Sequence, residues 1–375
     1  MSLTVSTDIP FGNACNISVE EVDGGTVVSF DADPKGGPEA MWFCLRLNGP
    51  VPEGEKVRVV LRHVQTLLGG SDPGKINPVA RAAGGDWIRI GPGNPEELGD
   101  GQKNAVWYVD YPDQYTDLAL CYPYGKPELD LLLSETSGYW EPAEIGVSQG
   151  GRPLIRLSNY GAAGDRATGV YVIARQHAGE TPGSWVLDGF LRKIASFGGD
   201  APLVWAVPLA DIDGVEEGAY GKDRYPYDLN RAWGQPPMRH EVLAYKRDLD
   251  YWFGITETGL GIDFHAPGCC ESGGIYAFLP NPDKFSGLHE MASKAAAGIK
   301  QHLSQFAAPE FGRVARYLSR WNTPSFSSHI CSRGLFALSL ETPYHQVGEM
   351  VLTRESYREA GERIADSVIE ISRDL

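Results

Sequence analysis

The chain has 375 residues, of which 42% are hydrophobic and 22% are charged. This composition is typical of a globular protein and excludes a disordered, collagen-like or coiled-coil chain. With 49 acidic against 33 basic side chains, the formal net charge of -16 argues against nucleic acid and anionic membranes as partners.

Membrane and export signals are missing from the sequence as printed. No run approaches the ~18 uninterrupted apolar residues of a membrane span, and the first residues lack a basic segment followed by an apolar one. The 6 cysteines show no CxxC pair and no framework spacing, so we expect reduced thiols in a cytoplasmic protein. The adjacent Cys269 and Cys270 are better interpreted as buried thiols than as metal ligands.

The first third of the chain predicts strands. Alternating or β-branched patterns bounded by Gly, Pro, Asn and Asp occur at residues 16–22, 26–33, 41–49, 56–64 and 104–111. These segments predict a small β-sandwich-like domain. We place the boundary between Tyr111 and Pro127, which gives a first domain over 1–121 and a second over 122–375.

The rest of the chain alternates helices with apolar strands. A helix is predicted over 126–135 and a strand over 169–175. Amphipathic helices with apolar residues at steps of three and four are predicted over 184–197, 288–303 and 357–371. This order predicts an α/β domain.

Candidate metal ligands stand where predicted strands end. His177 and Glu180 follow the strand that ends at Arg175, where a strand-to-helix loop presents side chains at the edge of a sheet. Gly179 allows the loop to fold back, so that the imidazole and the carboxylate can meet one ion. His265 ends another apolar run and would complete a His2Glu zinc site. Taken singly, His265 is better explained as an ordinary strand-end histidine, and the spacing of His177 and Glu180 alone carries no weight.

Two further groups have unusual positions. Glu341 emerges from the apolar run LFALSLE, and a buried carboxylate costs several kcal/mol unless it is paired, hydrated or functional. Asn230 and Arg231 lie in a loop rich in Gly, Tyr and Pro. Their amide and planar guanidinium suit a carboxylate, although a surface arginine is the ordinary interpretation.

The order of these motifs resembles that of the zinc carboxypeptidases of the carboxypeptidase A superfamily, and in particular of their cytosolic carboxypeptidase subfamily. The segment ARQHAGETPGSWVLDGFL resembles the subfamily's histidine-proline-glycine-glutamate segment, with Ala178 in place of the proline. IDGV followed by DLNRAW resembles its next motif, and CYPYGKPELDLLL resembles the start of its catalytic domain. WFCLRLNG and VWYVDY resemble parts of its N-terminal β-domain. The resemblance implies a mixed central sheet flanked by helices, preceded by a small β-sandwich domain.

The resemblance also implies a catalytic centre with one zinc ion. His177, Glu180 and His265 would hold the ion, and Asp228 would hydrogen-bond the far nitrogen of His177. Glu341 would take the proton of the zinc-bound water and deliver it to the leaving amine.

The implied substrate is the C-terminus of a peptide or protein. Asn230 and Arg231 would clamp its terminal carboxylate. Members of the subfamily process glutamate-rich tails, so acidic tails are one implied substrate class. Such tails need local positive charge, for which the candidates are Arg224, Arg320 and Arg333.

Two positions depart from the family pattern. The family's arginine before DLNR falls on Gly221, so Lys222 or Arg224 would have to supply positive charge to the oxyanion. The tyrosine that closes over substrate in digestive relatives falls near Ser319, and the neighbouring Tyr317 is assigned no role.

Two other functions stay open. An N-acyl amino acid amidohydrolase of the aspartoacylase and succinylglutamate desuccinylase type would share the fold and the HxxE…His site. The helix after the zinc motif and the N-terminal position of the β-domain favour the carboxypeptidase. A non-catalytic binding protein would keep the fold alone, and retention of the three proposed ligands and Glu341 argues against it.

Overall fold

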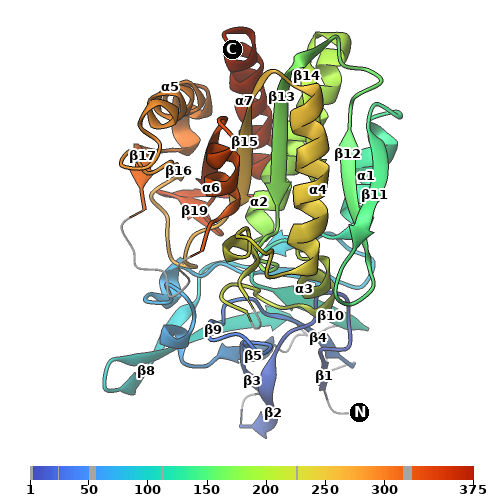
Figure 1. The fold of residues 1–375 in the computed structure, drawn as a ribbon. Helices are drawn as coiled ribbons and strands as arrows, with labels where there is room; N and C mark the ends of the chain where they lie inside the picture. The colour runs from blue at the N-terminus through green and yellow to red at the C-terminus, as the bar shows by residue number, and fades with distance from the viewer. Residues whose placement is uncertain (1–2, 24, 50–55, 111–113, 225–226, 316–322) are drawn as a thin grey trace.

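The computed structural model describes residues 3–23, 25–49, 56–110, 114–224, 227–315 and 323–375. It has a β-rich part, built from the first strands of the chain, and an α/β part built from the later ones (Figure 1). The expected mixed central sheet flanked by helices is confirmed.

The β-rich part contains two five-stranded sheets. In order across the first sheet lie β1 (Thr4–Ser6), β4 (Cys44–Asn48), β10 (Tyr115–Ala119), β6 (Val79–Ala82) and β7 (Ile88–Arg89). Across the second lie β2 (Cys15–Val22), β3 (Gly25–Asp31), β5 (Lys56–Leu61), β9 (Gln102–Asp110) and β8 (Asn94–Gly99). Aromatic rings join the two sheets, since Phe43 lies 5.2 Å from Phe30 and 6.5 Å from Trp107 between ring centroids.

The α/β part is built on an eight-stranded sheet. Its order is β11 (Glu141–Val147), β12 (Pro153–Ser158), β14 (Pro202–Val207), β13 (Asp165–Ala174), β15 (Thr258–His265), β18 (Phe336–Glu341), β16 (Ile275–Leu279) and β17 (Ala307–Val314). The four central strands β14, β13, β15 and β18 are parallel to one another, whereas β11, β12 and β16 make antiparallel pairs. The parallel strands therefore bring their carboxyl ends to one edge.

Helices cover both faces of this sheet (Figure 1). One face carries α2 (Thr181–Phe197), α5 (Ser286–Leu303) and α7 (Arg354–Arg373), and the other carries α4 (His240–Ile255) and α6 (Phe326–Ser332). Strand β13 alternates accordingly, with Val170 and Val172 in the first core and Tyr171 and Ile173 in the second. The remaining elements are α1 (Lys126–Glu135), α3 (Ile212–Glu217), β19 (Gln346–Val347), β20 (Met350–Val351) and the 3-10 turns Val64–Thr66, Pro73–Lys75, Gly198–Asp200, Leu229–Arg231 and Ser304–Phe306.

The two parts share one continuous apolar core. Arg89 of β7 reaches into the α/β part, where its guanidinium donates to the carbonyls of Tyr344, at 2.6 Å, and Leu352, at 3.1 Å. The apolar packing is continuous across this contact and marks no division between the two parts. The domain boundary predicted between residues 121 and 122 therefore stays a prediction. None of the helices in the described ranges is long and apolar enough to cross a membrane.

Candidate metal centre

The loop that follows β13 is held by a buried arginine. Arg175 adopts a φ of 64°, a left-handed conformation that is uncommon for residues other than glycine. Its guanidinium donates to the carbonyl oxygens of Ala178, at 2.7 Å, and Tyr124, at 2.8 Å, and to Ser184 Oγ, at 3.3 Å. Burial lowers the pKa of Arg175 to about 10, against the opposing effect of nearby acidic groups. These hydrogen bonds fix the path of the chain from β13 to α2.

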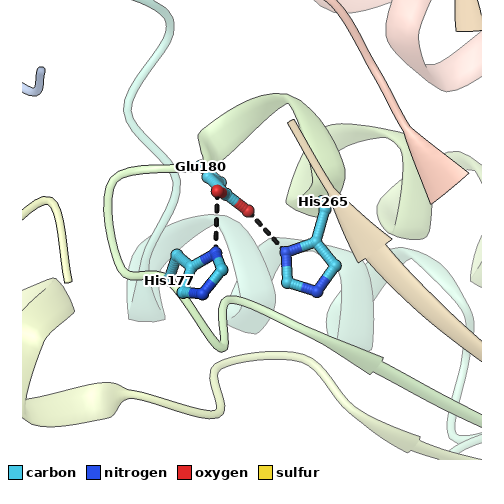
Figure 2. A group of neighbouring side chains, drawn as sticks. All are labelled: His177, Glu180 and His265. Carbon is cyan, nitrogen blue, oxygen red and sulfur yellow. Dashed lines mark hydrogen bonds and ion pairs between the residues drawn. The ribbon is translucent and has the colours of Figure 1, made fainter. Parts of the chain in front are cut away.

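Three buried donors converge at the end of this loop (Figure 2). His177 Nδ1 lies 2.8 Å from Glu180 Oε1, and His265 Nδ1 lies 2.6 Å from Glu180 Oε2. The candidate ligand atoms of these residues all lie within 4.8 Å of one another. Two imidazole nitrogens and a carboxylate are a donor set that zinc uses in catalytic sites. The structure thus brings together the three ligands expected from the sequence.

The electrostatics of this cluster favour positive charge. Burial opposes a charge on His177, but Glu180 and Asp228 outweigh it and raise its pKa to about 9. The pKa of His265 is likewise raised well above its ordinary value against burial, by Asp263 and Glu180. Burial raises the pKa of Glu180, yet the two histidines outweigh it and lower the value. A carboxylate cluster that stabilises protons on two imidazoles suits a divalent cation as well.

Asp228 lies behind His177. Its Oδ1 is 3.2 Å from His177 Nε2, and the same oxygen accepts the Asn230 N–H at 2.8 Å. The aspartate thereby caps the turn Leu229–Arg231 and contacts the nitrogen that faces away from Glu180. Asp228 is therefore placed where the resemblance implies.

A second carboxylate behind the centre escaped the sequence analysis. Asp263 Oδ2 lies 2.7 Å from His265 Nε2 and is fully buried. Asp263 is two residues before His265 on β15, and alternate residues of a strand share one face. The spacing of two residues within a predicted strand could therefore have indicated that Asp263 and His265 lie on the same face.

Glu341 stands beside the candidate metal donors because of strand register. In the parallel pair of β15 and β18, His265 and Glu341 are direct partners. Burial raises the pKa of Glu341 to about 7, with His265 opposing the rise and Glu180 adding to it. A carboxyl group that titrates near neutrality can both accept and return a proton.

A cavity of about 580 Å³ opens over these groups, and its lining includes His177, His265, Glu341, Lys222, Asn230 and Arg231. The Asn230 amide is held from both ends, since its Oδ1 accepts the Phe326 N–H at 3.0 Å and its Nδ2 lies 3.1 Å from Asp263 Oδ2. The guanidinium of Arg231 donates to the Asn230 carbonyl at 2.8 Å.

The β-rich part contributes to the same cavity. Leu68 and Gly69 line it together with Pro267 and Gly268 of the loop after β15. The Cys269 N–H donates to the Leu68 carbonyl at 3.0 Å, so the two loops are joined backbone to backbone. The cavity wall is therefore shared between the two parts of the molecule.

Position 221 cannot carry the arginine of the family pattern. Gly221 has a φ of +91°, and a Cβ there would come within 2.6 Å of the Ala178 nitrogen. Lys222 lines the cavity, whereas Arg224 pairs with Glu217 and is not among the lining residues that the structure describes. Of the two basic groups expected from the sequence, Lys222 is the better placed.

Other expected residues lie elsewhere. Tyr317, Ser319 and Arg320 fall outside the described residues. Arg333 pairs with Asp250 at the end of α6.

The cysteines are free thiols. All six cysteines are unpaired by disulfides. Cys269 and Cys270 are both buried, with their Sγ atoms 3.7 Å apart. The expected burial of these two thiols is confirmed.

Known proteins similar to this chain carry carboxypeptidase names. Cytosolic carboxypeptidase 6 of Mus musculus is 24% identical over 317 residues, and that of Homo sapiens is 29% identical over 318. Each alignment covers 76% of this chain, and the chain covers 58% and 62% of these relatives' own lengths. Cytosolic carboxypeptidase 2 of Xenopus tropicalis is 32% identical over 50% of this chain and 22% of its own. No family model matches the chain.

Solved structures with the same fold are metallo-carboxypeptidases. The crystal structure of the metallo-carboxypeptidase from Burkholderia cenocepacia superposes with a TM-score of 0.77 at 20% identity, covering 100% of this chain and 99% of that one. The Pseudomonas aeruginosa metallo-carboxypeptidase in complex with (2-guanidinoethylmercapto)succinic acid gives 0.74 at 16% identity, covering 99% of each chain. The family resemblance expected from the sequence is confirmed: this chain is a relative of the cytosolic carboxypeptidases and has the fold of the metallo-carboxypeptidases.

Proposed function

We propose that the protein is a zinc-dependent metallocarboxypeptidase that removes C-terminal residues from peptides or protein tails. The observation that carries the proposal is the convergence of His177, Glu180 and His265 in the wall of a cavity that Glu341 and Arg231 also line. The carboxypeptidase names of the relatives support it.

Each residue has a distinct part in the proposed reaction. Zinc held by the three donors would polarise the scissile carbonyl and lower the pKa of water. Glu341 accepts the proton of the attacking water and delivers it to the leaving amine. Lys222 supplies positive charge near the carbonyl oxygen, where negative charge develops. Asp228 holds the His177 ring in one tautomer and orientation.

Arg231, with Asn230, binds the terminal carboxylate of the substrate. A guanidinium recognises a carboxylate through two parallel hydrogen bonds and so measures the end of the chain. Glutamate-rich tails are a proposed substrate class, for which the described part of the cavity lining supplies Lys222, Arg231 and Lys284. We place the enzyme in the cytoplasm, in keeping with the names of its relatives and its free thiols.

The test compares peptides that differ only at the C-terminus. Zinc-loaded protein is incubated with peptides bearing free or amidated C-termini and with N-acyl amino acids, and released residues are quantified. We expect release from free C-termini only, with loss of activity on chelation and recovery with zinc. Equal cleavage of amidated peptides would contradict an exopeptidase, and cleavage of N-acyl amino acids alone would favour the amidohydrolase.

Arg231→Ala tests the carboxylate clamp in the same assay. Because the guanidinium binds a group present in both ground and transition states, we expect a raised KM for free C-termini with a smaller change in kcat. Arg333→Ala is the matched control, since Arg333 pairs with Asp250 outside the cavity lining that the structure describes. An unchanged KM in Arg231→Ala would remove this residue from substrate binding.

A further inference from the structure

One buried carboxylate oxygen gathers three donors from three segments of the chain. Asp263 Oδ2 lies 2.7 Å from His265 Nε2, 2.7 Å from Gln176 Nε2 and 3.1 Å from Asn230 Nδ2. His265 is a metal donor, Gln176 is the residue next to His177, and Asn230 belongs to the turn beside the cavity. A single side chain therefore contacts the metal centre and the substrate-binding loop together.

The direction of the two amide hydrogen bonds is fixed by other contacts. His265 Nδ1 faces Glu180 Oε2 at 2.6 Å, so with zinc bound at Nδ1 the ring proton would lie on Nε2, which is 2.7 Å from Asp263 Oδ2. Gln176 Oε1 accepts from Trp233 Nε1 at 2.8 Å, and Asn230 Oδ1 accepts from the Phe326 N–H. Neither amide can be turned over without losing that acceptor, so both NH2 groups face Asp263, and the Asn230 Nδ2 also lies 2.9 Å from His265 Nε2.

Burial of the Asp263 carboxylate lowers the stability of the folded protein. Asp263 is fully buried, and its second oxygen, Oδ1, has no hydrogen-bond partner in the described part of the chain. A buried carboxylate with one unpaired oxygen is unfavourable compared with an amide or an apolar side chain of similar size.

We infer that Asp263 is a positioning residue that sets the ring orientation of His265 and the amide orientation of Asn230. It stands to His265 as Asp228 stands to His177, so each imidazole of the centre has its own carboxylate on the far nitrogen. An anion on that nitrogen raises the donor strength of the imidazole toward a metal. The inference rests on the proposed zinc site.

Asp263→Asn tests the inference with metal binding as the readout. The amide keeps the size of the side chain and removes the charge. We expect zinc affinity, measured by chelator competition, to fall about 10–100-fold, and the absorption bands of the cobalt-substituted protein to shift. KM for free C-termini should rise as well, because a neutral amide oxygen accepts from the Asn230 NH2 group more weakly than a carboxylate does.

Asp188→Asn is the matched control. Asp188 is also fully buried and accepts from Tyr124 at 3.1 Å, Arg192 at 2.7 Å and Arg358 at 2.8 Å, but it lies on α2 outside the cavity lining that the structure describes. This variant should lose stability while keeping wild-type zinc affinity and cobalt spectrum. Equal loss of zinc affinity in both variants would overturn the inference, because the effect would then be one of general stability.

Trp233→Phe covers the case in which Asp263→Asn does not fold. It removes the N–H that donates to Gln176 and keeps a smaller aromatic ring in the same place, so we expect a smaller loss of zinc affinity in the same direction. If the variant that folds binds zinc within about twofold of wild type and keeps its cobalt spectrum, Asp263 is not a positioning residue. Wild-type protein that binds no zinc would instead overturn the proposed function itself.

Discussion

The pKa of the Glu341 carboxyl group is set by opposing effects of burial and neighbouring charges. Burial raises its pKa, the neighbouring His265 lowers it and Glu180 raises it again, with a net value of about 7. Its position follows from strand register, because it is the direct partner of His265 across β15 and β18. The group is thus close to the proposed metal without being one of the three convergent donors.

Glu341→Gln separates proton transfer from metal binding. The amide keeps the size of the side chain and cannot accept a proton, so we expect kcat to fall by about 10²–10⁴-fold. Zinc content, measured by atomic absorption, should stay at the wild-type level. Glu290→Gln, at an exposed glutamate of α5, is the control and should change neither quantity. Zinc lost together with activity would make Glu341 a ligand, contrary to the proposed role.

The sequence predicts single residues unevenly. His177, Glu180 and His265 could be anticipated because each follows an apolar run, and strand ends meet at one edge of a parallel sheet. Asp263 could not, since its contacts with Gln176 and Asn230 depend on how distant segments pack. The exclusion of a side chain at Gly221 likewise depends on a backbone contact with Ala178 that sequence spacing does not reveal.

Among the elements, helix α2 connects the metal centre to the core. It begins at Thr181, directly after Glu180, and packs along α7 in one buried layer. The two helices meet where Gly189 has no side chain, because a Cβ there would come within 2.1 Å of the Arg358 carbonyl oxygen. Helix spacing in this layer is therefore set by a glycine in a helix interior.

Gly189→Ala should destabilise the protein in spite of alanine's higher helix propensity. The methyl group must push α7 away, and overpacking of this kind costs about 1–3 kcal/mol. Gly254→Ala in α4 is the matched control, since nothing lies within 4 Å of a Cβ there. That change should stabilise by about 0.5–1 kcal/mol. Urea unfolding measures both, and equal effects would contradict close packing at Gly189.

The elements themselves were predicted where the pattern was long and regular. Helix α1 spans Lys126–Glu135, the range expected, and the C-terminal helix is confirmed as α7. Helix α4 was missed although Val242, Tyr245, Leu249 and Trp252 follow helical spacing and are buried. The short strands β1, β6 and β7 were missed because segments of 3, 4 and 2 residues carry too few alternations to differ from loops. Strand β8 was missed because its sequence, NPEELG, is mostly polar and shows no apolar alternation.

At the scale of the whole molecule, a buried polar cluster links the β-rich part to the α/β part. The Arg89 guanidinium lies 3.2 Å from Nδ1 of His345, and this nitrogen donates to the Asn77 carbonyl at 3.1 Å. Burial and the charge of Arg89 hold the pKa of His345 well below its ordinary value, so the folded protein keeps this imidazole neutral.

His345 should make stability depend on pH. The unfolded chain takes up a proton on this ring below about pH 6.5, whereas the folded protein resists it. The unfolded state then binds more protons, so stability present above that pH is lost as the pH falls. We expect His345→Gln to show a smaller drop in the free energy of unfolding between about pH 7.5 and about pH 5 than wild type.

Urea unfolding at the two pH values measures this difference. His240→Gln is the control, because His240 is exposed at the start of α4 and its ring meets water in both states. It should keep the wild-type pH dependence. A His345→Gln variant with the same drop as wild type would show that other groups carry the acid sensitivity.

The cavity wall formed by Leu68, Gly69, Pro267 and Gly268 comes from two different parts of the chain, and only one of these parts carries the proposed zinc donors. All three proposed zinc donors come from the α/β part, whereas Leu68 and Gly69 of the cavity lining come from the β-rich part. In the proposed enzyme, replacement of the Leu68–Gly69 loop would therefore alter which tails enter the cavity and leave the three proposed zinc donors unchanged. Substitutions in this loop would change the substrate preference of the proposed enzyme without touching its metal site.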